Sequence, residues 1–318
     1  MEEQVPNRRY VRKKRRFRFG RFFMTLLVIA FIGVSIFSIV QYKAGQKLAA
    51  TQNHEEIEFT GDPLDVKNPS IENILVLGVD SRGEEQSRTD TMMLVSWNKK
   101  TDEVNVVSFM RDIYAQIPGY KSYKLNTAYY LGGVQLAKDT ISSMFGVPIH
   151  HYALIDFKSF ESLVDIAAPE GVELEVEKAM SEKIGVSLQP GLQKLNGKEL
   201  LGYARFRADA EGDFGRVARQ QKVMEALKDE VLSPKNAKNY PKFAGAIQGY
   251  VQSDYSTTEE VKQVLSLASS GGVNINKLTI PVEHSYEYAD YSGVGSVIEI
   301  NIDKNKQALS DFIGMPVR

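Results

Sequence analysis

The chain has 318 residues, of which 43% are hydrophobic and 25% charged, the proportions of an ordinary globular protein with room for a sizeable core. It contains no cysteine, which excludes thiolate catalysis, cysteine-based metal sites and a disulfide framework. The formal net charge of −1 conceals an uneven distribution, because nine of the 39 lysines and arginines precede Phe22, against two glutamates, which leaves 30 basic and 38 acidic residues in the rest of the chain.

An uncharged apolar stretch, "FFMTLLVIAFIGVSIFSIV", occupies residues 22–40. Its length is close to the roughly 20 residues that a helix needs to cross a membrane. We therefore expect a basic cytoplasmic tail over 1–21 and a transmembrane helix over 22–40. The alternative is a cleaved signal peptide, whose apolar region would be shorter, about 7–15 residues.

The basic tail also fixes the expected orientation. Lysine and arginine stay on the cytoplasmic side of a span, so the tail is expected in the cytoplasm and everything after residue 40 outside the cell. A basic arm could instead bind nucleic acid, but its role in topology accounts for the charge, and no nucleic-acid partner is expected. The sequence thus predicts a single-pass protein of the cell membrane.

Residues 41–70 are polar and lack a sustained period, which predicts an extracellular stalk leading into a folded domain over 71–318. Expected strands, two of them forming a hairpin, are "NILVLGVD", "TMMLVSWNKKTDEVNVVSFM", "GVELEV" and "VNINKLTIPV", and a strand running into a helix is expected at "HYALIDFKSFESLVDIA". Expected helices are "GGVQLAKDTISSMFG", "NGKELLGYA", "RVARQQKVMEALKDEVL" and "KNKQALSDFIG". This order predicts a layered α-β-α domain of the α/β class with a mixed central sheet.

Charged side chains gather where the first two expected strands meet, in "GVDSRGEEQSRTDTMM". Asp80 ends one strand, Asp90 begins the next, and Arg88 lies between them. Strand ends at the edge of an open α/β sheet are where ligands usually bind. Two aspartates held there suit a hard divalent cation, Mg²⁺ with Mn²⁺ as the alternative, that fills its other positions with phosphate oxygens and water. The competing interpretation is that both aspartates are turn residues and caps.

Further basic side chains follow the second strand of the hairpin. Arg111 and Asp112 come directly after it in "SFMRDIYAQIPGY", and Lys124 and Asn126 precede a helix in "YKLNTAYYLGG". With a simple register, Arg111 lies at the same sheet edge as the aspartates. Arginine binds phosphate in a bidentate manner, so arginines leaving several elements near carboxylates predict a metal-bridged phosphate or pyrophosphate site.

The stretch "GYARFRADAEGDFGRVARQ", residues 202–220, is unusually rich in arginine. Arg205 and Arg207 share one side only if the chain is extended there, so the helix before them is expected to end near Ala204. Asp213 is expected to cap the next helix, with Arg216 in its first turn, where a bound anion would offset the unfavourable helix dipole. Gln220 follows Arg216 on the same helix face.

The competing interpretation of this stretch is structural. Asp209, Glu211 and Asp213 could pair with the arginines and serve stability alone. Elsewhere the chain has no Walker loop, no G-x-S-x-G elbow and no H-E-x-x-H motif, and its four histidines show no ligand spacing. The aromatic-rich "SYEYADYSG" is expected to form a surface loop, with an aromatic floor for a sugar as the alternative.

Taken together, "GVDSR", "SRTDTMM", "MRD" and "YARFR" followed by "DFGR" and "RQ" resemble the LytR-CpsA-Psr family of Gram-positive cell-envelope proteins over roughly residues 71–230, and its MsrR-like subgroup in particular. The resemblance implies a phosphotransferase that moves an anionic glycopolymer, such as wall teichoic acid or a capsular chain, from a polyprenyl-pyrophosphate carrier to peptidoglycan through a phosphodiester. The family also has a long apolar tunnel for the lipid, to which the sequence assigns no residues.

The resemblance also carries over residue by residue. Asp80 and Asp90 would hold Mg²⁺, and Asp213 and Gln220 would orient the arginines. Arg219 falls in the same motif, and it is expected to bind substrate together with Gln220, Lys124 and Asn126. The pyrophosphate would be bound by Arg88, Arg111, Arg205, Arg207 and Arg216. Many relatives have Ile-Pro before the Arg-Asp pair where this chain has Phe109-Met110, a difference expected to alter the pocket wall only.

Two other functions are compatible with the same residues. A pyrophosphatase or phosphodiesterase with water as acceptor would need the same metal and arginines. A non-catalytic membrane-anchored sensor could bind polyprenyl-phosphate lipids and regulate envelope stress responses.

Overall fold

The computed structural model describes residues 19–50, 57–80, 88–256 and 274–317, and the chain divides into two compact units, 1–40 and 41–318. Helix α1 (Phe19–Ala49) covers the sequence of the expected span. Among the residues that are described, no helix is both long enough and apolar enough to cross a membrane. Most of the basic tail lies outside the described residues, as do the side chains of 22–26 and 29, and the transmembrane helix stays a prediction.

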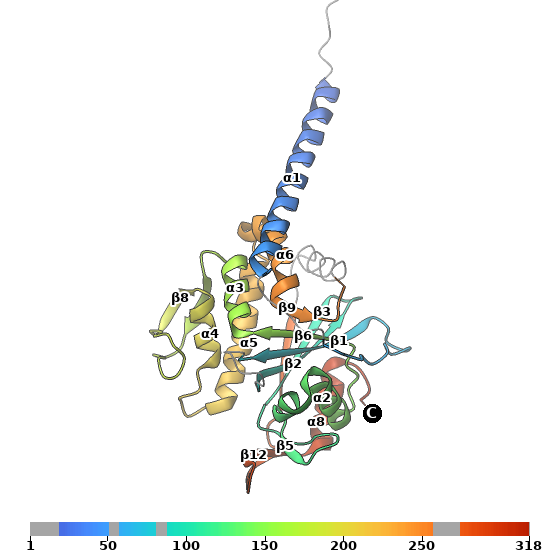
Figure 1. Ribbon diagram of the computed structural model, residues 1–318, viewed down its shortest axis with the longest axis vertical. Coiled ribbons are helices and arrows are strands. Elements are labelled where there is room, and N and C mark those ends of the chain that lie inside the picture. The colour runs from blue at the N-terminus through green and yellow to red at the C-terminus, as the bar shows by residue number, and fades with distance from the viewer. Residues whose placement is uncertain (1–18, 51–56, 81–87, 257–273, 318) are drawn as a thin grey trace, which may run out of the picture. The chain divides into compact units, whose positions relative to one another are not determined.

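A six-stranded mixed sheet forms the centre of the larger unit (Figure 1). Its strand order is β10-β3-β2-β1-β6-β9, in which β1 pairs in parallel with β6 and β10 with β3, while the other neighbours are antiparallel. The strands are β1 (Ile71–Val79), β2 (Thr89–Asn98), β3 (Glu103–Phe109), β6 (His151–Asp156), β9 (Val251–Ser253) and β10 (Ile275–Ile280). This confirms the predicted mixed central sheet.

Helices cover both faces of the sheet, as predicted (Figure 1). Helices α2 (Thr127–Phe145) and α8 (Ile302–Ile313) pack on one face, and α3 (Phe157–Ala167), α4 (Gly197–Arg205), α5 (Gly212–Val231) and α6 (Tyr240–Tyr250) lie on the other side, with the 3₁₀ helix η1 (Pro234–Asn239) before α6. Three two-stranded hairpins complete the unit: β4 (Tyr114–Gln116) with β5 (Ser122–Lys124), β7 (Val172–Val176) with β8 (Gly191–Leu195), and β11 (Tyr286–Tyr291) with β12 (Gly295–Ile300).

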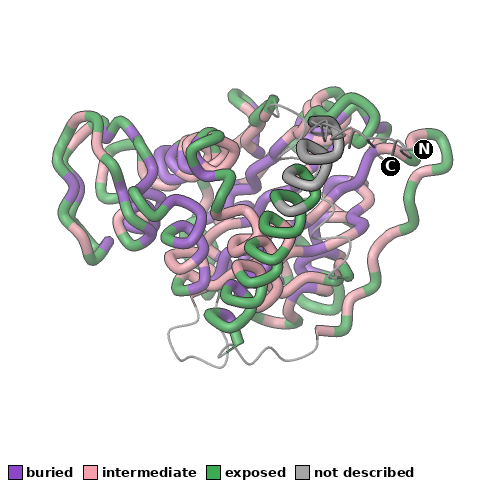
Figure 2. The backbone as a smooth tube through the Cα atoms, turned by 90° about the horizontal axis from the view of Figure 1, so that it is seen from above, coloured by how far each residue is buried: buried purple, intermediate pink, exposed green. Residues whose placement is uncertain are grey.

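Burial explains why the first strand is so uniformly apolar. Strand β1 is central, and Leu75 and Leu77 are completely buried. The main core lies between the sheet and helices α2 and α8, where Ile141, Phe145 and Leu309 are also completely buried. A second core joins α3, α4 and α5 to the β7-β8 hairpin around Tyr203. Figure 2 shows the buried segments running through the middle of the unit beneath exposed turns.

Local signals set most of the helix ends. Asn196 and Glu199 form a capping box at the start of α4, and Gly146 closes α2 in the left-handed conformation. Two expectations were wrong. Helix α5 begins at Gly212 after Glu211, so Asp213 lies in its first turn and does not cap it. The aromatic-rich stretch forms strand β11, because Tyr286 and its neighbours pair with β12, and it is not a surface loop.

Two parts of the expected stalk pack against the domain. Residues 41–49 continue helix α1 and lie against α6, where the hydroxyl of Tyr250 donates to the carbonyl of Leu48 at 3.0 Å. Further on, Asp62 accepts hydrogen bonds from Lys138 Nζ at 2.6 Å and from the backbone N–H of Ile149 at 2.8 Å. The polar composition of 41–70 therefore serves fixed contacts in these two parts.

Candidate active site

The carboxyl ends of three strands meet at one edge of the sheet. Strands β1 and β6 are parallel, and β3 runs in the same direction because β2 is antiparallel to both β1 and β3. Asp80, Arg111 and Asp156 therefore leave or end their strands on the same side, which is where open α/β sheets place their ligands. The simple register assumed for Arg111 is confirmed.

A β-bulge at the start of β2 brings Asp90 to this edge. The pairs Gly78–Thr91 and Val79–Thr89 leave Asp90 without an opposite residue on β1. As a result, Asp90 and Thr91 are consecutive half-buried residues that line the same cavity, although successive residues of a regular strand face opposite sides of a sheet. Bulges frequently redirect a side chain next to an active site, and here the redirected side chain is a carboxylate.

Two arginines and two aspartates form a charged cluster at the centre of the site. Arg111 donates from Nη1 to Asp90 Oδ1 at 2.7 Å and from Nε to Asp213 Oδ2 at 3.2 Å. Arg216 lies 3.2 Å from Asp213 Oδ2 and 3.7 Å from Asp90 Oδ1. Burial alone would raise the pKa of Asp213, but the charges of Arg216 and Arg111 hold it below its ordinary value.

Arg216 is the most buried member of this cluster, and its side chain is only 5% exposed. Its Nε has no hydrogen-bond partner among the described residues. Burial, followed by the charge of Arg111, lowers the pKa of Arg216 below the ordinary arginine value. Arg216 is the fifth residue of α5, so it lies just past the first turn in which it was expected. A buried cation with an unused donor near a helix N-terminus is a site built for an anion.

Arg205 and Arg207 extend the positive charge along the same edge. Helix α4 ends at Arg205, and Phe206 is extended, as the two-residue spacing predicted. Arg205 lies 3.4 Å from Asp80 Oδ2 and 4.5 Å above the ring of Phe157, a cation–π contact. Arg207 is exposed and makes no ion pair or hydrogen bond with a described residue, and it faces the same cavity as Arg205. Its charge is therefore available to a ligand.

A cavity of about 800 Å³ opens from this cluster into the space between the sheet and helices α3, α4 and α5. Charged residues line one end, including Asp90, Arg111, Arg205, Arg207, Asp213 and Arg216. Most of the remaining wall is apolar, from Val76, Met93, Ile155, Phe157, Phe160, Leu201, Val223, Met224 and Leu227. We call this space the apolar cavity. It suits an amphiphile with a highly charged head and a long apolar tail.

A second space, of about 420 Å³, lies on the other side of Arg111. Arg88, Asp112, Lys124, Asn126 and Tyr130 line it together with Arg111, and we call it the polar cleft. Lys124 Nζ lies 2.9 Å from Asp112 Oδ1, and the guanidinium of Arg88 lies 5.7 Å from the centre of the Tyr130 ring. The predicted residues Arg88, Lys124 and Asn126 are thus brought together, in a separate space from the Arg205–Arg216 group.

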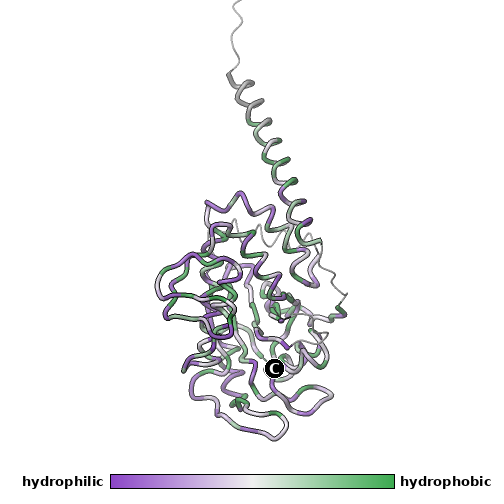
Figure 3. The backbone as a smooth tube through the Cα atoms, turned by 60° about the vertical axis from the view of Figure 1, so that its left-hand side comes forward, coloured by the Kyte–Doolittle hydropathy of each residue, from purple (hydrophilic) through white to green (hydrophobic). Residues whose placement is uncertain are grey.

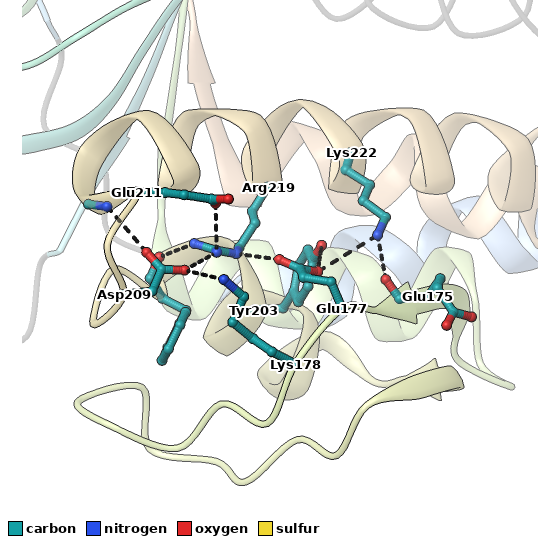
Figure 4. Close-up of polar contacts among 10 residues, drawn as sticks. Glu175, Glu177, Lys178, Tyr203, Asp209, Glu211, Arg219 and Lys222 are labelled. Carbon is teal, nitrogen blue, oxygen red and sulfur yellow. Dashed lines mark hydrogen bonds and ion pairs between the residues drawn. The ribbon is translucent and has the colours of Figure 1, made fainter.

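The side chain of Arg219 points toward Glu177, Asp209 and Glu211 (Figure 4). Its side chain, 3% exposed, donates to Glu177 Oε1 at 2.8 Å and to the carbonyl of Phe206 at 3.1 Å, and it also pairs with Asp209 and Glu211. Burial alone would lower the pKa of Arg219, but the hydrogen bonds to Glu177 and Asp209 raise it. It lines neither the apolar cavity nor the polar cleft. For Arg219, the competing interpretation therefore applies, in which the arginines of this stretch pair with acids and serve stability alone.

Gln220, the neighbour of Arg219, does reach the site. Its side-chain amide donates to Thr91 Oγ1 at 3.0 Å, and the residue lines the apolar cavity. This bond holds α5 against the bulged start of β2. The contact of Gln220 is therefore with the strand that carries Asp90, and the expected role in orienting the arginines stays a prediction.

The described residues include no group of three or more histidine, aspartate or glutamate side chains that could hold a metal ion by themselves. Asp80 and Asp90 nevertheless offer two hard carboxylates at neighbouring strand ends. Mg²⁺ is usually bound through one or two carboxylates, with phosphate oxygens and water as its other ligands. The donor set therefore fits a Mg²⁺ ion that is bound together with a phosphorylated ligand.

The sequence did not reveal which apolar residues line the cavity. Phe157 and Phe160, three residues apart on α3, follow the same spacing as residues that pack into a core. Tyr130 in the cleft lies in the short first part of α2, before the non-helical residues Gly132 and Gly133 interrupt that helix. For Tyr130 the one available signal was its position four residues after Asn126, which places it near the start of the same helix.

Comparison with known proteins agrees with this geometry. The chain is 46% identical to the regulatory protein MsrR of Staphylococcus aureus over 248 residues, covering 78% of this chain and 76% of that protein. It is 34% identical to the polyisoprenyl-teichoic acid–peptidoglycan teichoic acid transferase TagU of Enterococcus faecalis, covering 66% and 70%. The solved structure of TagT bound to LI-WTA is 25% identical, with a TM-score of 0.61 over 83% of this chain and 97% of that one.

The family model for LytR-CpsA-Psr proteins matches residues 35–310, a range that contains the charged cluster, the apolar cavity and the polar cleft. The chain belongs to the LytR-CpsA-Psr family.

Proposed function

We propose that this protein is a phosphotransferase that moves an anionic glycopolymer, of the wall teichoic acid or capsular type, from a polyprenyl-pyrophosphate carrier to peptidoglycan. One observation carries the proposal: a cluster of arginines, among them the buried Arg216 with an unbonded Nε, lines a cavity whose remaining wall is mostly apolar. The name of the TagU relative describes a transfer of this kind. A polyprenyl pyrophosphate has the matching chemistry, a charged head on a long apolar tail.

Different residues would bind the pyrophosphate, position the arginines and bind the lipid in such a transfer. Phosphoryl transfer requires little covalent chemistry from a protein and relies on positioning and charge neutralisation. Arg111, Arg205, Arg207 and Arg216 would bind the pyrophosphate oxygens, and Asp213 would hold Arg111 and Arg216 in place through the bonds described above. The apolar wall would take the polyprenyl chain. Mg²⁺, held by Asp80 and Asp90, would neutralise further charge on the pyrophosphate.

We place the domain outside the cell, anchored by the apolar helix of residues 22–40. Large apolar side chains along α1 are exposed in the first unit, including Phe31 at 74% and Val34 at 65%, and Figure 3 shows the hydrophobic character of this helix. Exposed apolar surface of this extent normally marks contact with another apolar phase. A reporter fused to the C-terminus tests this topology, and reporter activity in the cytoplasm would contradict it.

A regulatory function is the second candidate, because the relative with 46% identity is named a regulatory protein. A sensor would bind the lipid-linked ligand at the same arginines without turning it over. A hydrolase would use water in place of peptidoglycan.

The test is reconstitution of the full-length protein in lipid nanodiscs with a polyprenyl-pyrophosphate glycopolymer and peptidoglycan fragments, with and without Mg²⁺. We expect a glycopolymer–peptidoglycan phosphodiester, detected by mass spectrometry, that is lost in Arg207→Ala and kept in Lys198→Ala, the control at an exposed cation of α4 that lines neither space. Binding of the donor without product would support the sensor. Release of the polymer to water alone would support the hydrolase.

A further inference from the structure

Arg111 forms a wall shared by two spaces. Its guanidinium lines both the apolar cavity and the polar cleft. The cluster that would bind pyrophosphate therefore has a lipid-compatible space on one side and a polar space on the other.

The lining of the polar cleft matches a saccharide. Tyr130, 37% exposed, offers an aromatic face, against which the apolar face of a sugar ring can pack. Asn126 is only 4% exposed, and its Oδ1 accepts no hydrogen bond from the described residues. Buried polar atoms are normally hydrogen-bonded, so this oxygen points to a ligand with a hydroxyl or N–H donor. Apolar ring faces and many hydroxyl groups are what a saccharide presents.

The charge of the cleft narrows the class of saccharide. Arg88, Arg111 and Lys124 face it, while Asp112 is the one carboxylate that lines it among the described residues. Lys124 pairs with Asp112 at 2.9 Å, and Arg111 pairs with Asp90 and Asp213, which leaves Arg88 as the cation in excess among the described residues of the cleft. Such a surface favours a sugar that carries an acidic group over a neutral one.

The geometry of phosphoryl transfer indicates which of the two substrates this saccharide would be. In phosphoryl transfer the attacking and leaving oxygens lie roughly in line on opposite sides of the phosphorus. With the polyprenyl phosphate leaving toward the apolar cavity, the attacking hydroxyl must come from the other side of Arg111, where the cleft opens. We propose that the polar cleft binds the acceptor, an acidic saccharide with a free hydroxyl, and that Asp112 takes the proton from this hydroxyl. This inference rests on the proposed function.

The transfer forms one bond to phosphorus and breaks another. The acceptor oxygen forms a bond to the sugar-linked phosphorus, and the bond between that phosphorus and the bridging oxygen breaks. The bridging oxygen keeps the electron pair and departs with the polyprenyl monophosphate. The hydroxyl proton passes to the Asp112 carboxylate.

Direct binding tests the cleft without relying on turnover. The full-length protein in nanodiscs is titrated with a carboxylate-bearing disaccharide–peptide of peptidoglycan and, separately, with a neutral N-acetylglucosamine oligomer. Tyr130→Ala is expected to weaken both by at least fivefold, and Lys124→Gln to reduce the preference for the acidic probe. Tyr120→Ala, an exposed tyrosine that does not line the cleft, is the matched control and should change neither. Equal binding in Tyr130→Ala and Tyr120→Ala overturns the assignment.

Asp112→Asn tests the proton step. We expect kcat for transfer to the saccharide to fall at least a hundredfold while the affinity for the polyprenyl-pyrophosphate donor stays within twofold, and the acidic limb of the pH–rate profile to disappear. An unchanged pH profile contradicts the role of Asp112. Loss of donor affinity in the Tyr130 and Lys124 variants with acceptor binding intact would mean that the cleft holds the donor polymer, and the proposal would fall. If no transfer occurs but the acidic probe still binds in a Tyr130-dependent manner, the proposed function fails and the binding site stands.

Discussion

Arginines only a few residues apart in the stretch 202–220 serve opposite purposes. Arg219 is surrounded by acceptors, with Glu177, Asp209 and Glu211 all within ion-pair distance. Arg207 is exposed and faces the apolar cavity without a described partner. Composition and spacing alone did not separate the two, because whether an arginine is paired depends on acids that come from elsewhere, as Glu177 does from the end of β7.

This difference predicts opposite effects of substitution. Arg219→Ala removes a buried cation and leaves Asp209 and the more exposed Glu177 without its hydrogen bonds, which should lower the free energy of unfolding by roughly 1–3 kcal/mol. Arg207→Ala should leave stability unchanged or slightly raised while transfer falls by at least about tenfold, which corresponds to about 1.4 kcal/mol of transition-state binding. Thermal melts and transfer assays on both variants check this. A large drop in melting temperature for Arg207→Ala would contradict its assignment to the ligand site.

The strand-end carboxylates give a second prediction. Asp80→Asn and Asp90→Asn keep the shape of each side chain but remove the charge that Mg²⁺ needs. Each variant should lose Mg²⁺-dependent transfer with little loss of fold, and should also lose the rise in melting temperature that Mg²⁺ with a soluble pyrophosphate gives the wild type. Asp229→Asn, at an exposed aspartate on α5, is the control. Unchanged Mg²⁺ dependence in both variants would refute the metal role.

At the scale of elements, β1 and β6 are joined by a charged group beside their backbone pairing. His151 donates from one ring nitrogen toward Asp254 at 2.8 Å and from the other toward Glu72 at 3.1 Å, and Lys99 lies 2.6 Å from Glu72. Burial alone would lower the pKa of His151, but these two carboxylates raise it to about 9. Burial alone would raise the pKa of Glu72, but His151 and Lys99 lower it to about 2. The group is therefore charged at neutral pH.

A pH dependence of stability follows. Because the folded pKa of His151 is raised from 6.5 to about 9, its contribution is complete below about pH 6.5 and is lost as the pH rises through 9. Because the folded pKa of Glu72 is lowered from 4.5 to about 2, its contribution is complete above about pH 4.5 and is lost as the pH falls through 2. Urea unfolding of the wild type should show less stability at pH 10 than at pH 6. His151→Gln should reduce this difference, and an equal difference in the variant would contradict the assignment.

Glycines set the contact between the end of α1 and helix α6. A Cβ on Gly245 would lie 2.1 Å from the carbonyl oxygen of Tyr42, and one on Gly45 would lie 2.0 Å from the carbonyl oxygen of Lys242. These backbones approach so closely that no side chain fits between them. Gly245→Ala should therefore lower stability by about 1–3 kcal/mol through overpacking. Gly33→Ala, where nothing lies within 4 Å of the added carbon, is the control and should be neutral or slightly stabilising. Equal melting temperatures for the two variants would contradict this contact.

The sequence predicted elements well where a local rule decides them. Apolar runs and alternation located the sheet strands, and Asn196 and Gly146 marked helix ends through capping. It did not predict the bulge at Asp90, which depends on how β2 is paired with β1. Nor did it predict strand β11, whose aromatic side chains gain their order from tertiary contacts, such as the stacking of Tyr291 on Tyr114 at 4.6 Å.

At the scale of the whole molecule, the site lies where the apolar cavity and the polar cleft meet at Arg111. The meeting of Asp80 and Arg111 could be anticipated because the carboxyl ends of parallel strands converge at one edge. The apolar cavity could not be anticipated from the sequence, since the residues of its wall follow the same periodicity as core residues. If donor and acceptor occupy opposite sides of Arg111, both are bound before transfer begins. Initial rates measured over a matrix of donor and acceptor concentrations should then give intersecting double-reciprocal lines, and parallel lines would indicate a covalent enzyme intermediate instead.

The bulge at Asp90 has a consequence for how this chain tolerates changes in length. Deleting Thr91 would put Asp90 in the ladder position opposite Gly78 that Thr91 now holds, so the carboxylate would leave the place in which it contacts Arg111 while the strand kept its pairing. A single-residue deletion there would thus produce a protein that folds but is inactive. A homologue with a regular strand at that position is therefore expected to keep the fold and to lack the transfer activity.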